Sequence, residues 1–404
     1  MNRVVPLTAA LLMVAALTAC IPEKRIVWSP DGERAAVATP NGLFFIGPDG
    51  RVLKPRLEGS PTRAAWFPDG RRLAVVSAAK ARHWSDAEPL FRPEELSDIK
   101  VLAERLREEL LEFDGDWTEF HVDAEQRMPP AIELAALLYV RDHLCEGLPE
   151  KLNEHWEQAA TLEPLIWKLN VATLHDDRLE LGPPLVSTFN EIYQPKVSPD
   201  GRKIALLMAM TSEPDESPAL HVVSADGSAV RTVIQHVAID YDWSPDSTSL
   251  AFIRTQSPGT REGAIQLGAL CTIRVAGKDG TLLKEWEQFQ DRAAVIFNPF
   301  LGVRWLTDGR LIFSAFEANL PAALHDTPGQ WSLFCLDPRM PAGVSRVLRR
   351  DLDLPLDRSL ALFEVSPDER RVLIPGPKGV CQICLLYTSD AADDLLCVDL
   401  GGRR

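Results

Sequence analysis

The chain has 404 residues, and its 58 Asp and Glu against 43 Lys and Arg give a formal net charge of −15 at pH 7. An acidic balance of this size argues against binding to nucleic-acid phosphates, which needs clustered Lys and Arg, so we expect no nucleic-acid partner. It suits a soluble globular surface. The length exceeds that of one typical domain.

Residues 1–19 have the pattern of a signal peptide. Arg3 supplies the positive start, and residues 4–19 are mostly apolar but too short to span a bilayer comfortably. The segment ends Leu17-Thr18-Ala19-Cys20, which resembles a bacterial lipobox. The resemblance implies that Cys20 is acylated, with residues 20–23 as a short tether. An ordinary signal peptide that happens to contain a cysteine is the alternative.

Ile21 follows the cysteine at the position where an aspartate would signal retention in the inner membrane. By that enterobacterial sorting pattern, the resemblance implies an outer-membrane lipoprotein that faces the periplasm. We therefore expect a bacterial cell-envelope protein, held on the membrane through its lipid anchor.

One arrangement recurs along the rest of the chain: a large hydrophobic residue, a turn of the Pro-Asp-Gly type, and an apolar strand. Pro fixes φ for a tight turn, Asp bonds nearby backbone N–H groups, and Gly accepts a positive φ, so each copy predicts a hairpin. Six copies are present, at residues 28–32, 66–70, 197–201, 243–246, 305–309 and 365–368.

Most copies carry a second turn, as at Pro48-Asp49-Gly50 and Ala225-Asp226-Gly227. Four strands in roughly 40 residues are typical of a β-propeller blade. We therefore predict an all-β fold over residues 24–383: a β-propeller with six or more four-stranded blades. A β-sandwich with coincidental turns is the alternative. The repeat resembles that of TolB-type, WD40-like propellers, which implies a fold but no particular activity.

Residues 84–163 interrupt the second blade with a helical pattern. Pro93 and the acidic pair after it start a helix whose apolar residues recur at helical spacing as far as Phe113. Residues 132–144 and 149–161 predict two further helices. We expect a helical insertion between strands two and three of this blade, with its own core against the propeller rim. A lid over the channel or a partner-docking surface is the alternative.

Charged residues recur one or three positions before the hydrophobic residue that opens each turn. These positions share one face of the first strand, and first strands line the central channel of a propeller. The predicted channel-lining residues are Arg25, Arg63, Lys196, Asp240, Asp242, Arg304 and Glu364. Mixed signs favour mutual ion pairing in a wet channel over an anion or metal site, and a ligand site is the other interpretation.

No catalytic or cofactor motif is present. The chain lacks G-x-S-x-G, a Walker loop and H-E-x-x-H, so we expect neither catalytic residues, nor a cofactor, nor a metal. Cys271 and Cys335 fall at like positions in consecutive blades, whose sheets pack about 10 Å apart. That separation exceeds the reach of a disulfide, so we expect buried free thiols.

The leading hypothesis is a non-catalytic, lipid-anchored scaffold that binds a protein of the cell envelope or another ligand, as the resemblance to TolB-like propellers implies. The alternative is the propeller domain of a prolyl-oligopeptidase-like serine hydrolase whose catalytic domain is lost by the truncation at Ile383. A G-x-S-x-G motif after a strand in the sequence downstream would distinguish the two. A third interpretation is a hydrolase or lyase site within the channel, for which Asp240 and Asp242 are the candidate carboxylates.

The last stretch departs from the propeller pattern. The run C-L-L-Y-T-S-D-A-A-D-D over residues 384–394, and V-D-L-G-G-R-R over 398–404, resemble the in-frame translation of a transposase-based sequencing adapter. The resemblance implies that residues 384–404 are adapter-derived and that the last blade is truncated at Ile383. The C-x-x-C pair of Cys381 and Cys384 would then be spurious.

Overall fold

A computed structural model describes most of the blade repeats and part of the helical insertion. The predicted signal peptide, Cys20 and its tether, and the helix expected at 149–161 lie outside the described residues, as does most of 384–404. The described residues are 25–112, 130–146, 165–175, 178–208, 218–234, 237–255, 268–275, 281–286, 293–294, 302–317, 330–340, 345–349, 363–366, 368–376, 379–384 and 398–399.

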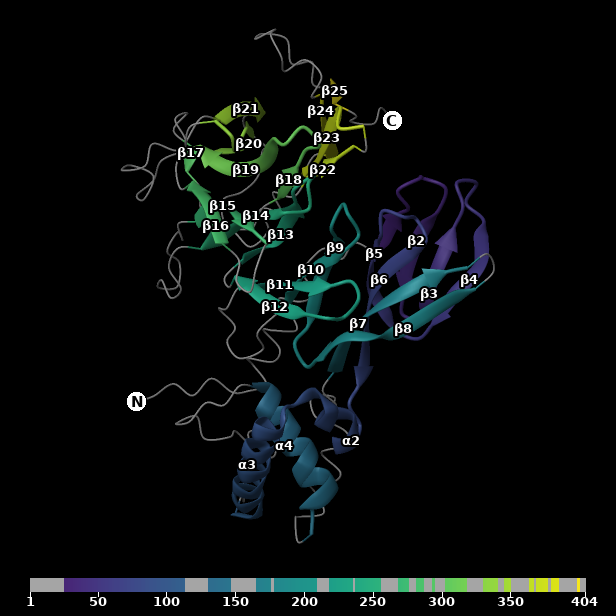
Figure 1. The fold of residues 1–404 in the computed structure, drawn as a ribbon, viewed down its shortest axis with the longest axis vertical. Coiled ribbons are helices and arrows are strands. Elements are labelled where there is room, and N and C mark those ends of the chain that lie inside the picture. The colour runs from purple at the N-terminus through teal and green to yellow at the C-terminus, as the bar shows by residue number, and fades with distance from the viewer. Residues whose placement is uncertain are drawn as a thin grey trace. The chain divides into compact units, whose positions relative to one another are not determined.

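The chain divides into two compact units. The first is built on Met1–Pro195 with two short pieces, Met208–Glu216 and Ala225–Gly227, and the second holds the remainder. The strands of the described residues form six antiparallel sheets, and in five of them strands that are consecutive in sequence pair with each other (Figure 1). This connectivity is that of propeller blades, so the predicted all-β fold class is confirmed.

The first unit contains two complete sheets. The first consists of β1 (Ile26–Trp28), β2 (Ala35–Thr39), β3 (Gly42–Ile46) and β4 (Val52–Glu58). The second consists of β5 (Pro61–Trp66), β6 (Arg72–Lys80), β7 (Leu165–Leu174) and β8 (Leu179–Thr188). One face of each packs into a shared apolar core that includes Leu43, Phe45, Trp66 and Leu73.

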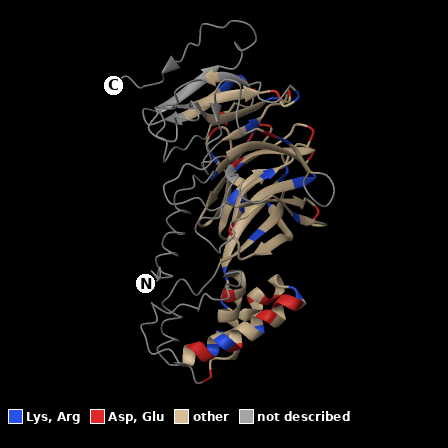
Figure 2. Cartoon of the chain, turned by 90° about the vertical axis from the view of Figure 1, so that its left-hand side faces the viewer, with Lys and Arg blue, Asp and Glu red and all other residues tan. Residues whose placement is uncertain are grey.

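The helical insertion lies between β6 and β7, as predicted. It consists of α2 (Trp84–Ala87), a 3-10 turn η1 (Glu88–Leu90), α3 (Pro93–Glu112) and α4 (Pro130–His143). Its apolar face is buried around Ile99, Leu106 and Ala135, and the same cluster takes in Ile166 and Phe189 from the second blade. The insertion therefore shares its core with that blade. Figure 2 shows acidic and basic residues intermingled on its helices.

The third and fourth sheets each have four strands as well. The third consists of β9 (Ile192–Val197), β10 (Lys203–Met208), β11 (Ala219–Ser224) and β12 (Val230–Ile234). The fourth consists of β13 (Val237–Trp243), β14 (Ser249–Thr255), β15 (Gly268–Arg274) and β16 (Thr281–Trp286). Leu250 and Phe252 are fully buried, and so are Ala251 and Ile253, so β14 is covered on both faces.

The fifth sheet departs from the predicted four strands. Two short strands, β17 and β18, both pair with β19 along one edge, so the first strand of this blade is in two pieces. The sheet consists of β17 (Ala293–Ala294), β18 (Val303–Trp305), β19 (Leu311–Glu317), β20 (Gln330–Leu336) and β21 (Ser345–Arg349).

The sixth sheet consists of β22 (Glu364–Val365), β23 (Arg371–Gly376), β24 (Gly379–Cys384) and β25 (Val398–Asp399). Its outermost strand is two residues long and comes from the stretch whose sequence resembles a translated adapter.

The six turns share one geometry. In the first, Gly32 N–H donates to the Ser29 carbonyl over 2.9 Å, and the Asp31 carboxylate accepts from Glu33 N–H at 3.0 Å. The Ser29 hydroxyl donates to Asp31 and helps to lower the pKa of that carboxyl. The last turn position has positive φ in every copy, which suits Gly; its occupants are Gly32, Gly70, Gly201, Ser247, Gly309 and Glu369.

Neighbouring blades are also joined through tryptophans of their first strands. Trp66 Nε1 donates to the Val27 carbonyl at 3.0 Å, and Trp243 Nε1 donates to the Lys196 carbonyl at 2.9 Å. Both acceptors lie one residue before the turn-opening residue of the preceding blade. These two bonds hold β5 against β1 and β13 against β9.

Candidate functional site: a charged cluster on four first strands

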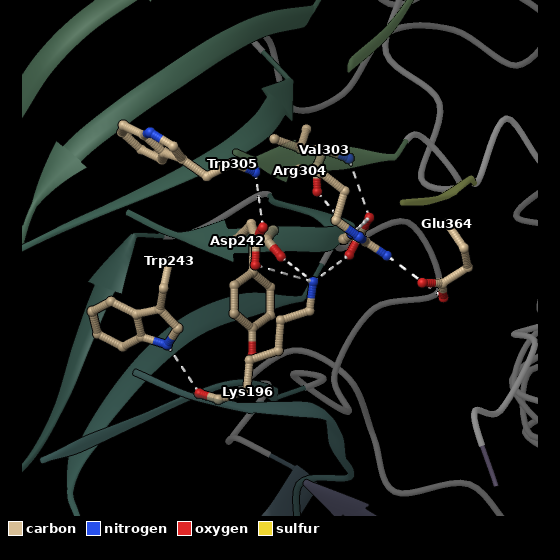
Figure 3. A network of polar contacts seen from close by, with 9 residues as sticks. Lys196, Asp242, Trp243, Val303, Arg304, Trp305 and Glu364 are labelled. Carbon is tan, nitrogen blue, oxygen red and sulfur yellow. Dashed lines mark hydrogen bonds and ion pairs between the residues drawn. The ribbon is translucent and has the colours of Figure 1, made fainter. Parts of the chain in front are cut away.

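Five of the seven predicted channel-lining residues meet in one cluster within the second unit. Lys196 comes from β9, Asp240 and Asp242 from β13, Arg304 from β18 and Glu364 from β22. Figure 3 shows Lys196, Asp242, Arg304 and Glu364 within this network. Each strand is the first of its sheet and ends at a repeat turn, which explains why the residues converge. We call these five residues the charged cluster. Their place along a central channel stays a prediction.

Asp240 is the centre of the charged cluster. Its side chain is 2% exposed, and its Oδ1 accepts from Lys196 Nζ at 2.8 Å. Its Oδ2 accepts from Arg304 and from the Val303 N–H at 3.1 Å. Burial alone would raise the pKa of Asp240, but Arg304 and Lys196 hold it below its ordinary value. Asp240 therefore joins three sheets through one ionised carboxylate.

Asp242 is engaged more loosely than Asp240. Its Oδ2 accepts from the Trp305 N–H at 2.8 Å, but its Oδ1 lies 3.9 Å from Lys196 Nζ, outside hydrogen-bond distance. Burial raises the pKa of Asp242, and Lys196 and Arg304 offset only part of that effect. Two carboxylates that are two residues apart on one strand are thus shifted in opposite directions.

The two cations of the charged cluster make further contacts, one of them to the neighbouring ring of Tyr241. Arg304 reaches Glu364 at 3.9 Å, and burial would lower the pKa of Arg304 if its acidic neighbours did not raise it further. Lys196 Nζ lies 5.1 Å from the centre of the Tyr241 ring, a cation–π geometry. Burial, together with the two nearby aspartates, raises the pKa of the Tyr241 hydroxyl. All these contacts favour the ion-paired state.

Arg63 lies in the first unit and has partners of its own. Its guanidinium donates to the Ile192 carbonyl and to Glu191 Oε1, both at 2.8 Å. The rings of Trp167 and Tyr193 flank it at 5.4 and 4.9 Å. Glu191 was missed by the sequence analysis because it precedes β9 and is 128 residues away from Arg63. Arg25, the seventh predicted residue, is exposed directly before β1.

Cys271 and Cys335 are buried and form no disulfide, which confirms the expected thiols. Burial raises the pKa of Cys271 to about 12, although Arg254 acts in the opposite direction. A thiol with so high a pKa is a poor nucleophile at neutral pH.

No group of three or more His, Cys, Asp or Glu side chains in the part of the chain that the structure describes could hold a metal ion. No helix among the described residues is long and apolar enough to cross a membrane.

No protein-family profile matches the chain, and no curated protein sequence matches it. Solved structures do resemble it. A candidate 6-phosphogluconolactonase from Bacteroides uniformis has a TM-score of 0.42 at 12% identity, over 93% of this chain and 83% of that protein. A candidate TolB from Agrobacterium tumefaciens has a TM-score of 0.36 at 13% identity, over 85% and 86%.

A third similar structure is the acylaminoacyl peptidase of Pyrococcus horikoshii. It has a TM-score of 0.42 at 11% identity, and the match covers 91% of this chain. The chain spans 44% of the length of that peptidase. At these identities and scores the likenesses concern the fold and carry no argument about activity.

Proposed function

We propose that the chain is a non-catalytic binding scaffold of the bacterial cell envelope, lipid-anchored at Cys20 in the outer membrane and facing the periplasm, with an envelope protein as its partner. The observation that supports this proposal is the internal pairing of the charged cluster. Both oxygens of its most buried carboxylate, Asp240, already accept hydrogen bonds, from Lys196, from Arg304 and from a backbone N–H.

A general acid or base needs an oxygen within reach of a substrate proton. In the charged cluster, Asp240 and Asp242 each accept a backbone N–H from β18, at Val303 and Trp305. Carboxylates bound in this way fix the first strands relative to one another. This arrangement favours a rigid platform over a catalytic centre.

A short tether would hold the scaffold close to the membrane. The tether of residues 20–23 and Lys24 together make five residues between the start of Cys20 and Arg25, the first described position. At about 3.4 Å per extended residue they span at most roughly 17 Å. A partner would therefore bind the scaffold near the membrane surface.

Anchoring is tested by metabolic labelling with radioactive palmitate and by membrane fractionation. The wild-type chain is expected to incorporate label and to sediment with outer membranes, and Cys20→Ser to do neither. Cys145→Ser is the matched control, because Cys145 is an exposed cysteine elsewhere in the chain. Equal labelling of the Cys20→Ser variant would refute the anchor.

Partner binding is tested by photo-crosslinking in intact cells, with benzoylphenylalanine at position 364. Glu58 is the control position, because its side chain is 78% exposed on an outer strand, against 54% for Glu364. The proposal requires a discrete adduct with an envelope protein from position 364 and none from position 58. The same adducts from both positions, or none from either, would contradict it.

A further inference from the structure

The first sheet, β1 to β4, has apolar side chains on both of its faces. On one face, Val27, Leu43 and Phe45 belong to the core that this sheet shares with the second. Because successive side chains of a strand point to opposite faces, Ile26 and Trp28 lie on the other side. These two side chains are 54% and 57% exposed. We call this second side the open face of the sheet.

Apolar side chains cross the open face from one edge of the sheet to the other. The row that pairs in register across the four strands consists of Trp28, Ala35, Ile46 and Val52. With strands about 4.8 Å apart, this row is about 14 Å long. Val52 at its far end is 67% exposed. A parallel row begins at Ile26 and continues through Val37 and Phe44.

The strand β4 adds positive charge to the open face. Leu53 and Leu57 of this strand pack against the core. Lys54 and Arg56 alternate with them and therefore lie on the open face. Arg56 pairs with the exposed Glu58 at 2.8 Å. These two cations and one carboxylate give a formal charge of +1, on a chain whose formal net charge is −15. The open face thus combines apolar and basic residues, as surfaces that bind anionic lipids do.

The open face also lies next to the predicted lipid anchor. β1 forms one edge of it and begins at Ile26, and residues 20–24 span at most roughly 17 Å. Trp28 lies two residues further along the same strand. Tryptophan is enriched where proteins meet the membrane–water interface. An acyl chain on Cys20 would therefore bring this face to the bilayer surface.

We propose that the open face rests on the membrane that anchors Cys20, with Trp28 and Val52 in the lipid interface and the basic strand β4 against anionic phospholipid headgroups. Buried apolar area and electrostatic attraction both contribute to binding of this kind. The contact would fix the orientation of the scaffold, which a flexible tether leaves free. The cellular role of this contact rests on the proposed anchoring, but the contact itself can be measured without an acyl chain.

The test uses the predicted mature chain, residues 20–404, with the change Cys20→Ser, so that no acyl chain contributes. Vesicles of phosphatidylethanolamine and phosphatidylglycerol present an anionic bilayer, and phosphatidylcholine vesicles present an uncharged one. Co-sedimentation measures binding. Quenching of tryptophan fluorescence by phospholipids with brominated acyl chains measures insertion, and Trp28→Phe identifies the part due to Trp28. Absence of palmitate labelling or of crosslinking would leave both measurements unaffected, so failure of the proposed function and failure of this inference are distinguishable.

The chain is expected to bind the anionic vesicles more tightly than the uncharged ones, and less tightly as salt is added. Brominated lipid should quench the chain more strongly than its Trp28→Phe variant. Val52→Ser should weaken binding about threefold, because it removes apolar area from the contact. Val101→Ser is the matched control, since Val101 is 62% exposed on α3 in the same unit, and it should leave binding unchanged.

Three outcomes would overturn the proposal. Equal quenching with and without Trp28 would show that the open face is covered by another part of the protein or by a protein partner. Equal weakening by Val52→Ser and Val101→Ser would indicate unspecific adsorption of apolar residues. Absence of binding to either kind of vesicle would show that the sheet makes no membrane contact of its own.

Discussion

Asp240 and Asp242 lie two residues apart on β13, and their carboxyl pKa values are shifted in opposite directions. Burial acts on both. The pKa of Asp240 is lowered despite burial because Arg304 and Lys196 both contact its carboxylate closely. Asp242 lies 3.9 Å from Lys196, and Lys196 and Arg304 offset the effect of burial on its pKa only in part. The two residues therefore make opposite contributions to stability at neutral pH.

Asp240→Asn is expected to destabilise the chain at pH 7. The change leaves Lys196 and Arg304 with no close carboxylate in a buried site, and breaking a buried pair typically costs about 3–5 kcal/mol. Because the pKa of Asp240 is lowered in the folded state, its stabilising effect is present at neutral pH and is lost as the pH falls through that pKa. Urea unfolding at pH 7 and at acid pH measures the loss of stability and its dependence on pH. Equal urea midpoints for the variant and the wild type at pH 7 would refute the central position of Asp240.

Asp242→Asn is expected to have the opposite effect. Because the pKa of Asp242 is raised in the folded state, the free energy of unfolding falls as the pH rises above the ordinary aspartate value, and the loss is complete once the pH exceeds the folded-state pKa. Asparagine keeps an acceptor for the Trp305 N–H and carries no charge. A gain of about 1 kcal/mol at pH 7 is expected, the size of an ordinary single-site effect, and it should vanish below the ordinary aspartate value, where the carboxyl is protonated in both the folded and the unfolded state. Destabilisation at pH 7 would show that Asp242 is a structural ion-pair partner.

Trp66 and Trp28 occupy equivalent repeat positions but differ in burial. Trp66 is 9% exposed, bonds Val27 and packs against Phe45 at 5.7 Å, whereas Trp28 is 57% exposed. Trp66→Ala should therefore cost about 3–5 kcal/mol, and Trp28→Ala no more than about 0.5 kcal/mol, as for an exposed position. Thermal unfolding of the two variants provides the comparison. Similar losses would show that Trp28 is covered by a further part of the protein.

Glu369 holds a position where most repeat turns have glycine. It has φ of 53°, and its carboxylate accepts from the Thr307 N–H at 2.8 Å and hydroxyl at 2.7 Å. Alanine and glycine both remove these bonds, but only glycine tolerates positive φ without strain. Glu369→Ala should therefore be less stable than Glu369→Gly by about 1 kcal/mol. Equal stability of the two variants in urea unfolding would argue against the left-handed conformation.

The turns and the members of the cluster could be predicted from the sequence because both depend on local patterns. Pro, Asp and Gly specify the hairpin, and a two-residue period places Asp240 and Asp242 on one face. The strength of each ion pair could not be predicted, because it depends on packing between strands. The partnership of Arg63 with Glu191 has the same origin, since it joins residues from two different blades.

Two features of the repeats could not be predicted from the residues of a single repeat. The interruption of the first strand in the fifth blade depends on where β17 and β18 pair with β19. The Thr307–Glu369 contact depends on two turns lying side by side. In both cases the sequence shows the segments involved, but packing between segments far apart in the chain determines how they contact one another.

Carboxyl ¹³C NMR titration of Asp240 and Asp242 in the full chain tests most directly whether the charged cluster is compensated at one aspartate and under-compensated at the other. Asp240 should titrate below the ordinary value for aspartate and Asp242 above it. Two aspartates that titrate together near the ordinary value would contradict the cluster geometry.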